Sequence, residues 1–462
     1  FMIKLDLSLL LLIMNRKKSL IFFLIFILLV NCSFDNKTGI WSGDEKEKRR
    51  ISELEKEQKQ TKVVDYIYSS KSVYSKEISL TKKISISNPR KNLSWKMSSL
   101  NQQNFLGNIY LSGIDNIFLK KKIGKNKFPM SKIISSPLVF ENNIIFSDNN
   151  GTIFNINQNG EINWKKNIYK KIYKKVYKNL VFSIYQNNIY VADNIGFIYS
   201  IGLNNGKLVW IKNHGIPIKS NIKIYKNKIF LINQDNRILC FNTKNGSKIW
   251  DIRSVPSFIK LQNFLSSAIS KQGDVIAINS SGDLFKVNAN NGKIDWSLNT
   301  LESTLAHATD FFKSSEIVII DDNIIFSSKS SIFSYNLNTG YTNWKQEVSS
   351  IGAPIIDGKN IFILTDNGYF VIIDKDTGII ISSTNILKIL KKKKQETKIT
   401  GFIMGSGKIY SVTSNGYLIV SSAVSGKVEY FKKIGDPITS APIINNGKLY
   451  ILTKNSRIYG FD

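Results

Sequence analysis

The sequence of 462 residues predicts an all-β protein, specifically an eight-bladed β-propeller whose blades are four-stranded antiparallel sheets. Three observations lead to this prediction. From about Lys91 onward, short apolar runs alternate with turns rich in Asn and Gly. A phrase with Gly four residues before Trp recurs in the same region. It returns at intervals of about 40 to 50 residues, which is the period at which propeller blades repeat.

The first complete blade is expected between Ser136 and Lys165. This stretch reads SPLVF, IIFSD, TIFNIN and EINWKK, with ENN, NNG and QNG between the runs. Asn and Gly supply the positive φ angles that tight hairpins need. Four such runs joined by three turns predict a four-stranded antiparallel meander.

The second strand of this meander recurs along the chain, and its copies set the expected number of blades at eight. Each copy is a core of three residues, apolar in all but one position. The copies are IIF at 144–146, IYV at 189–191, IFL at 229–231, VIA at 275–277, IIF at 324–326, IFI at 361–363, IYS at 409–411 and LYI at 449–451.

The Gly and Trp of the recurring phrase are interpreted as a structural joint. Gly lies in the turn between the third and fourth strands, where the chain bends tightly. Trp lies on the outermost strand and has the size to cover the gap between neighbouring blades. A catalytic site would need one special copy, whereas this phrase repeats. The five intact pairs are Gly160 and Trp164, Gly206 and Trp210, Gly246 and Trp250, Gly292 and Trp296, and Gly340 and Trp344; weakened endings are Gly378 with Ser382 and Gly426 with Tyr430.

The last unit, APIINNGKLYILTKNSRIYGFD, supplies three strands and lacks a fourth. The ring is therefore expected to be closed by a strand from the N-terminal part of the chain. KNLSWKM at 91–97, which carries Trp95, is the expected closing strand. Closure of this kind removes the open sheet edges that promote aggregation.

The N-terminal part of the chain has the features of an export signal. Residues 1–31 are expected to be a signal peptide whose true start is Met14, because basic residues precede an apolar run of the right length at 19–30. The run ends in Leu-Val-Asn-Cys, which resembles a bacterial lipobox except for its Asn, and Cys32 is the expected lipidation site. Ser33 follows it, which favours anchoring in the outer membrane, facing the periplasm. Residues 32–90 are expected to be a charged tether, and residues 91–462 the propeller.

Composition and the remaining polar residues point away from common catalytic chemistry. The formal charge of +30 is spread over Lys residues in nearly every segment, without a nucleic-acid-binding motif. Cys240 is interpreted as a small buried hydrophobe. His214 and His307 lie in separate loops, and no metal site is expected. The Lys-rich runs at 165–179 and 387–395 are interpreted as solvated insertions between blades, with contact to an anionic membrane surface as the alternative.

The repeated Asn/Thr-Gly-Lys-x-x-Trp phrase resembles the docking motif of the pyrroloquinoline quinone (PQQ)-type propellers. Eight such blades behind a lipoprotein signal resemble the BamB family of the outer-membrane β-barrel assembly machinery. The resemblance covers about Lys91 to Asp462. It implies a non-enzymatic scaffold without a cofactor, which binds the POTRA domains of BamA and helps present unfolded outer-membrane proteins for insertion.

The same resemblance implies two partner-binding loops. One follows Trp250 and reads DIRSVPSFIKLQ, in which Pro256 and Ser257 match the family motif, Phe258 takes the apolar place and Lys260 is the nearest basic residue. The other follows Trp296, where Asp310 is the local acidic match. Solvated connections and a buried first strand are the alternatives. A PQQ-dependent dehydrogenase on the same fold is the alternative function, although the chain lacks adjacent cysteines and the insertions that build the pocket of those enzymes.

Overall fold

The structure, a computed structural model, describes residues 33–34, 41–42, 44–64, 74–125, 135–254, 265–300, 314–328, 330–394 and 397–462. The expected signal peptide and Cys32 lie outside these residues. The chain divides into two compact units, a smaller one comprising residues 1–64 and 168–176 and a larger one comprising residues 65–167 and 177–462.

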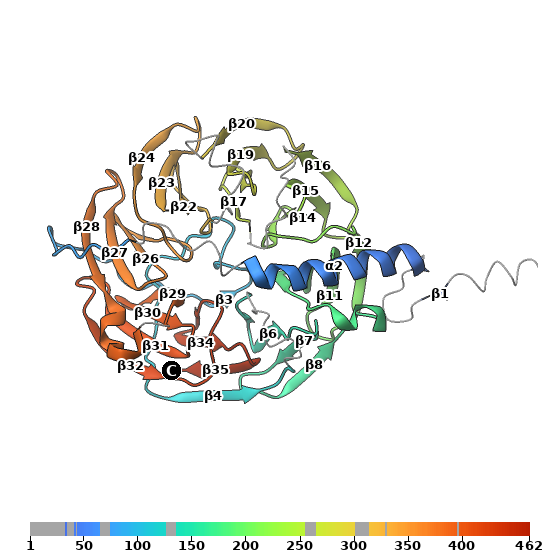
Figure 1. The fold of residues 1–462 in the computed structure, drawn as a ribbon, viewed down its shortest axis with the longest axis horizontal. Coiled ribbons are helices and arrows are strands. Elements are labelled where there is room, and N and C mark those ends of the chain that lie inside the picture. Colours follow the sequence, from blue (N-terminus) through green and yellow to red (C-terminus); the bar gives the residue numbers. More distant parts are fainter. Residues whose placement is uncertain are drawn as a thin grey trace, which may run out of the picture. The chain divides into compact units, whose positions relative to one another are not determined.

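The larger unit is a propeller, and among the described residues it has eight sheets arranged in a ring (Figure 1). Blades 1 to 4 are formed by β5 (Leu138–Phe140), β6 (Asn143–Ser147), β7 (Ile153–Ile156) and β8 (Ile162–Lys166); β9 (Leu180–Tyr185), β10 (Asn188–Asp193), β11 (Phe197–Gly202) and β12 (Leu208–Asn213); β13 (Lys223–Tyr225), β14 (Lys228–Ile232), β15 (Arg237–Asn242) and β16 (Lys248–Arg253); β17 (Ser267–Ile269), β18 (Asp274–Ile278), β19 (Asp283–Asn288) and β20 (Ile294–Asn299).

The second half of the ring repeats this arrangement. Blades 5 to 8 are formed by β21 (Val318–Ile320), β22 (Asn323–Ser328), β23 (Ser331–Asn336) and β24 (Thr342–Gln346); β25 (Ile355–Asp357), β26 (Asn360–Leu364), β27 (Tyr369–Asp374) and β28 (Ile380–Asn385); β29 (Ile399–Gly405), β30 (Lys408–Thr413), β31 (Tyr417–Ser422) and β32 (Val428–Lys433); β33 (Ile443–Asn445), β34 (Lys448–Leu452), β35 (Arg457–Phe461) and β4 (Ile117–Lys122). The predicted all-β, eight-bladed fold is confirmed.

The core of the propeller lies between neighbouring blades. The second strand is almost entirely buried in every blade, as β14 illustrates, whereas the fourth strand has exposed positions in every blade except blade 6, as β16 illustrates. Ile276 and Leu284 of blade 4, for example, pack in one cluster with Phe326 and Phe333 of blade 5. Because each blade buries apolar side chains against both neighbours, the ring is stabilised only when it is complete.

The ring is closed by an N-terminal strand, as expected, but by a different one. β4 pairs antiparallel with β35, with Leu119 opposite Gly460 and Lys122 opposite Arg457. The expected closing strand at 91–97 contributes only β3 (Ser94–Trp95), which pairs with β5 at the inner edge of blade 1. Side-chain size accounts for the two positions. The large Trp95 is buried at the centre of the ring. At the outer edge, the Phe118 ring of β4 covers the bare backbone of Gly460.

The residues before β3 also belong to the propeller. Residues 74–90 were expected to be part of the tether, but they pack along blade 6, where Ile78 pairs with Ser383 and the Thr81 amide donates to the Ile381 carbonyl. The Ser87 amide donates to the Asp357 carboxylate, and Ile84 joins the apolar cluster of blades 6 and 7. This cover explains the weakened sixth ending, because the fourth strand of blade 6 is buried beneath the chain.

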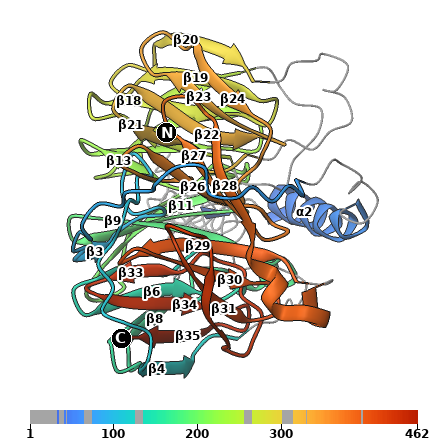
Figure 2. The same ribbon diagram turned by 90° about the vertical axis from the view of Figure 1, so that its left-hand side faces the viewer.

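The next residues, up to Ser112, continue around the inner ends of the blades. Figure 2 shows β3 at one face of the ring. Backbone and side-chain hydrogen bonds link residues 92–112 to blades 1, 2, 3, 4, 5, 7 and 8. We call residues 74–112 the N-terminal strap. It contacts the whole ring, because its first part covers blade 6 and its second part meets the others.

The smaller unit contains the helix α2 (Asp44–Val64), the 3-10 helix η1 (Lys171–Lys175) and a short sheet of β1 (Ser33–Phe34) and β2 (Trp41–Ser42). The Glu47 carboxylate holds this unit together, since it accepts hydrogen bonds from the Arg50 guanidinium at 2.6 Å and from the Tyr173 hydroxyl at 2.7 Å. Within the described residues, no helix has both the length and the apolar character needed to cross a bilayer.

Candidate functional site

The recurring tryptophans join each blade to the next. The indole of Trp210 in blade 2 lies against Gly246 of blade 3, and its Nε1 donates a hydrogen bond of 2.9 Å to the Thr243 carbonyl. Gly246 has φ of +68°, and a Cβ atom there would lie 2.5 Å from the indole ring. Glycine is needed for both reasons, the left-handed backbone and the close approach of the ring.

This geometry repeats at five consecutive blade interfaces. In each case a Cβ atom on the glycine would lie 2.5 to 3.1 Å from the indole. In each case the indole nitrogen donates to a carbonyl three residues before that glycine, over 2.8 to 3.3 Å. The pairs are Trp164 with Gly206, Trp210 with Gly246, Trp250 with Gly292, Trp296 with Gly340 and Trp344 with Gly378.

The closing interface uses different side chains in the same place. Gly160 of blade 1 faces Leu119 and the aliphatic stem of Lys121 from β4, where a Trp would otherwise lie. At the interface between blades 6 and 7, Gly426 faces Thr384 and Phe370. The joint therefore uses a bare glycine backbone at these seven interfaces, and an apolar stem can substitute for the indole.

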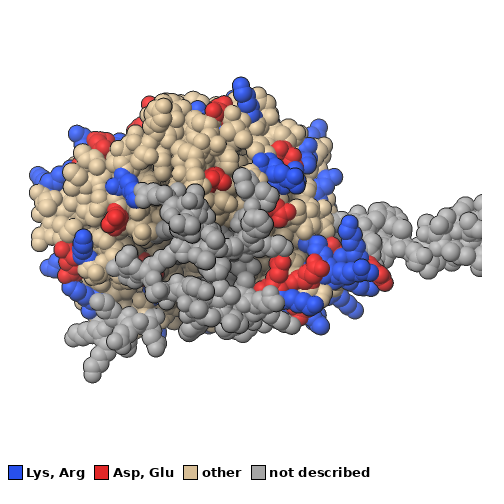
Figure 3. All heavy atoms as spheres, turned by 45° about the horizontal axis from the view of Figure 1, so that its top comes forward, with Lys and Arg blue, Asp and Glu red and all other residues tan. Residues whose placement is uncertain are grey.

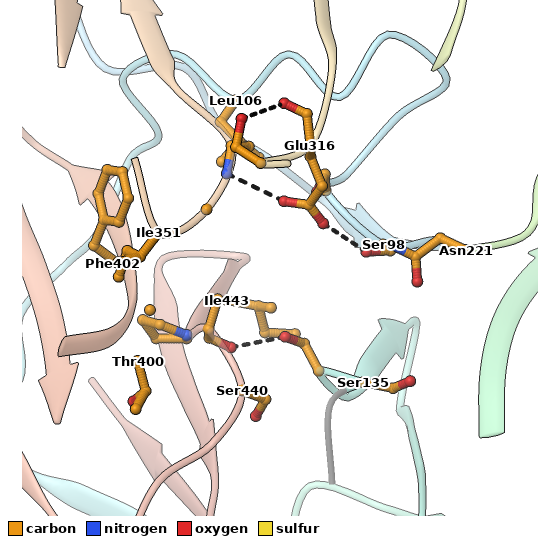
Figure 4. Close-up of a pocket in the computed structure, with 18 of the residues that line it drawn as sticks. Ser98, Leu106, Ser135, Asn221, Glu316, Ile351, Thr400, Phe402, Ser440 and Ile443 are labelled. Carbon is orange, nitrogen blue, oxygen red and sulfur yellow. Dashed lines mark hydrogen bonds between the residues drawn. The ribbon is translucent and has the colours of Figure 1, made fainter. Parts of the chain in front are cut away.

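The centre of the ring contains a cavity of about 320 Å³. Its walls come from the residues that precede or begin the first strands of the blades, and its other lining residues, including Trp95 and Leu106, come from the N-terminal strap. Figure 4 shows the Glu316 carboxylate directed toward Ser98 of the strap, with the hydroxyls of Ser135, Thr400 and Ser440 around the same space.

Hydrogen bonds hold the cavity wall and the strap in place. Glu316 accepts from the Ser98 hydroxyl at 3.3 Å and from the Ala353 amide at 3.2 Å. The Ser136 hydroxyl donates to the Ala441 carbonyl at 2.8 Å, which connects blade 1 to blade 8. The Ser136 hydroxyl therefore acts as a short connection between neighbouring blades.

Lys223 anchors the strap at the centre of the ring. Its side chain is fully buried, and its amine donates to the Asn101 carbonyl at 2.9 Å, the Ser98 carbonyl at 3.1 Å and Asn104 Oδ1 at 2.5 Å. Burial lowers the pKa of Lys223 to about 7, and the charge of Glu316 opposes this shift. The sequence analysis did not identify Lys223, because its three acceptors lie more than one hundred positions away along the chain.

The lining of the cavity does not fit a PQQ cofactor. PQQ is a polyanion, and a site for it needs cationic side chains or a bound cation. Among the described residues, the lining contains no Lys or Arg, and its single ionisable group there is the acidic Glu316. Within the described part of the chain, no three His, Cys, Asp or Glu side chains are grouped as metal ligands. The strap also fills part of the space at the axis.

The expected partner-binding residues Pro256, Ser257, Phe258, Lys260 and Asp310 lie outside the described residues. Their anchor points are described. The first segment leaves blade 3 after Ser254 and enters blade 4 at Leu265; the second leaves blade 4 after Thr300 and enters blade 5 at Ser314. Both segments are therefore attached to blade 4, at the end where the fourth strands finish.

Of two other residues singled out in the sequence, Cys240 is buried in the propeller and His214 is half-buried. Cys240 on β15 is fully buried, and burial raises the pKa of its thiol to about 12. His214 lies against the ring of Phe241, and burial lowers its pKa, helped by the charges of Lys248 and Lys212. Burial keeps the Cys240 thiol protonated and unreactive at neutral pH.

The described parts of the two Lys-rich runs include short 3-10 helices. Residues 387–395 begin in the 3-10 helix η3 (Ile386–Lys394), whose Leu387 and Leu390 are buried in the cluster between blades 6 and 7. Residues 165–179 contain η1, in which Tyr173 is buried. Both runs thus combine buried apolar residues with lysines.

Eight blades joined by docking tryptophans define the class of PQQ-like β-propellers. Within that class, the chain belongs to the family described as outer membrane protein assembly factor BamB, whose model matches residues 149–384.

Individual relatives are distant. Two proteins named outer membrane protein assembly factor BamB, from Moranella endobia and Yersinia pestis, are each 20% identical to this chain, over 62% and 57% of its length. These matches cover 64% and 66% of the relatives, so the chain spans slightly less than two thirds of either one.

Solved structures share the fold. BamB from Moraxella catarrhalis superimposes with a TM-score of 0.58 at 10% identity, over 74% of this chain and all of that one. A quinohemoprotein alcohol dehydrogenase from Comamonas testosteroni superimposes with a TM-score of 0.59 at 11% identity, over 80% of each chain. At these identities the likeness concerns the fold alone, and it includes both a BamB and an enzyme.

Proposed function

We propose that this protein is a non-enzymatic scaffold of outer-membrane β-barrel assembly. The observation that carries the proposal is its membership of the BamB family over residues 149–384. In this role it binds the POTRA domains of BamA, assists the folding and insertion of unfolded outer-membrane proteins, and needs no cofactor.

The centre of the ring supports a non-enzymatic role. The strap occupies part of the axis and is fixed there by Lys223, and the described lining of the remaining cavity combines apolar side chains with serine and threonine hydroxyls. A PQQ-dependent dehydrogenase needs a site for an anionic quinone in this place, and the part of the lining that the structure describes provides no cationic side chain for one.

The proposed BamA-binding surface consists of the segments at 255–264 and 301–313, with Pro256, Ser257, Phe258, Lys260 and Asp310. Their shared attachment to blade 4 supports the view that they form one surface. Phe258 is the proposed apolar anchor, since interfaces of this kind depend on a few buried aromatic side chains.

Co-purification tests this proposal. A C-terminal tag is used to isolate the protein from gently solubilised envelopes, and bound proteins are identified by mass spectrometry. Recovery of the barrel-assembly protein is expected, and Phe258→Asp is expected to reduce it at least about tenfold. The matched control is Ile379→Asp, which places the same charge at an exposed apolar residue of blade 6. Absence of any barrel-assembly component would refute the proposal, whereas equal loss with both variants would refute only the surface.

Lipid anchoring at Cys32 is part of the same proposal. It places the protein on the periplasmic face of the outer membrane, with the charged segment after Cys32 as a tether. Mass spectrometry of the membrane-extracted protein is expected to show a diacylglyceryl-modified Cys32 as the first residue. Cys32→Ser is expected to release the protein from membranes washed with high salt. Unmodified Cys32 in the mature protein would contradict this part.

A further inference from the structure

The last two positions of the fourth strand differ around the ring in a systematic way. These positions are equivalent in every blade, because each fourth strand ends at the connection to the next blade. In order from blade 1 to blade 8 they are Lys165–Lys166, Lys212–Asn213, Ile252–Arg253, Leu298–Asn299, Lys345–Gln346, Thr384–Asn385, Lys432–Lys433 and Lys121–Lys122. Consecutive lysines thus occur in blades 7, 8 and 1, which are neighbours in the closed ring.

Closure by β4 brings these three pairs together. They lie at positions 121–122, 165–166 and 432–433 of the sequence, and only the ring order makes them adjacent. Lys432 Nζ lies 5.7 Å from the centre of the Phe461 ring in blade 8. The stem of Lys121 lies against Gly160 of blade 1. We call these six residues the lysine edge; Lys120, also exposed, extends it.

Among the described residues of the propeller strands that carry the lysine edge, carboxylates lie away from it. Glu161 and Glu429 lie toward the opposite ends of β8 and β32, and Asp115 precedes β4. The nearest acidic residues at the lysine end are engaged: Asp148 accepts from backbone amides and is buried, and Asp436 is paired with Arg457. Figure 3 shows one face of the molecule, on which basic and acidic side chains are interspersed.

Four of the six lysines are exposed and two are half-buried. Tyr430 and Phe431 of β32 are also exposed, at 45% and 43%. Lysines together with exposed aromatic side chains are typical of surfaces that lie at a membrane interface. The lysine ammonium groups act as mobile point charges. The planar guanidinium of Arg, by contrast, suits an anionic ligand of fixed geometry.

We infer that the lysine edge binds the anionic phospholipid headgroups of a bilayer. Fluid headgroups can rearrange under point charges on three separate strands, whereas a protein partner would need carboxylates in a matching fixed pattern. Clusters of four to eight basic residues near a surface attract anionic lipid headgroups. Such contact would orient the ring with blades 7, 8 and 1 toward the membrane.

Vesicle flotation tests this inference with the full chain carrying Cys32→Ser, so that no lipid anchor contributes. Vesicles of phosphatidylcholine with and without phosphatidylglycerol are compared, and the neutral vesicles report the background from the apolar N-terminal run. The test variant changes the six lysines of the edge to Gln, which preserves most of the stem at Lys121. Its affinity for anionic vesicles is expected to fall at least about tenfold.

The matched control changes six exposed lysines of blades 2 to 4 to Gln and removes the same charge. These are Lys207, Lys212, Lys226, Lys244, Lys271 and Lys293. The control is expected to lose less than about twofold, since distant charges are screened by salt. Thermal unfolding of both variants checks their fold. Equal losses in the two variants, or no preference for anionic vesicles, would overturn the inference. So would binding of single-stranded RNA that depends on the edge when vesicle binding does not.

Discussion

The indole of Trp210 occupies the space that a side chain on residue 246 would need. A Cβ atom on Gly246 would lie 2.5 Å from the ring, and Trp210 also donates to the Thr243 carbonyl three residues earlier. The two residues belong to different blades, so their fit is a measure of how strongly neighbouring blades depend on each other.

A double-mutant cycle measures this dependence. Trp210→Ala is expected to lower the free energy of unfolding by about 2 to 3 kcal/mol, less than a fully buried Trp because the ring is half-exposed. Gly246→Ala is expected to lower it by more than the about 1 to 2 kcal/mol of backbone strain, because the ring is also displaced. In the Trp210→Ala background only the strain remains. The double variant should therefore lose less free energy of unfolding than the sum of the losses of the two single variants, as measured by urea denaturation. Additive losses would show that the contact is not formed.

Disulfide trapping distinguishes the two possible closing strands. Lys122 and Arg457 are cross-strand partners in the closed ring, so Lys122→Cys with Arg457→Cys is expected to form a disulfide under mild oxidation. Ser94→Cys with Arg457→Cys is the control, since β3 pairs with β5 instead. Mass spectrometry of tryptic peptides reads the result in a Cys32→Ser background. A disulfide between positions 94 and 457 would instead support ring closure by the segment at 91–97.

Stability should depend on pH through Lys223. Its pKa falls from 10.5 to about 7 on folding, so between these values the unfolded chain binds one more proton than the folded one. The contribution of Lys223 to the free energy of unfolding therefore rises with pH in this window, by up to about 1.4 kcal/mol per pH unit, and is flat below it. The free energies of unfolding of the unmodified protein and of Lys223→Met are measured by urea denaturation at several pH values. The difference between the two at each pH isolates the contribution of Lys223. A difference that does not change above pH 7 would contradict it.

The Cys240 thiol should be inert in the folded protein. It is fully buried, and its pKa is raised to about 12, so neither exposure nor ionisation favours reaction. In a Cys32→Ser background, a maleimide reagent is expected to label the protein only after denaturation. Labelling of the native protein at the rate of a free thiol would show that blade 3 opens readily.

Local features of the sequence were sufficient for the blades. Each strand carries its own apolar pattern and each hairpin its own Asn or Gly, so blade number and strand order follow from short stretches. The sequence also predicted a structural role for Gly206 and Trp164, because a motif that repeats around a ring indicates a joint between blades.

Long-range features were not predictable in the same way. The segment at 91–97 carries a Trp and so resembled a closing strand, whereas β4 carries none and closes the ring with Leu119 and the stem of Lys121. Lys223 gave no signal, since an isolated Lys at the start of a short strand is ordinary. Residues 74–90 look polar and charged, and only their contacts with blade 6 reveal that they are part of the propeller.

Closure by β4 also has a consequence for how the molecule folds. The side chain of Asn116 bonds to Asp462, a residue 346 positions away, and the strap must find partners on nearly every blade. Contacts of such high sequence separation form slowly. Blades 1 to 7 can assemble early, but blade 8 has no fourth strand until β4 docks. During that interval β35 presents a bare edge, which makes the nearly finished ring the species most exposed to misassociation.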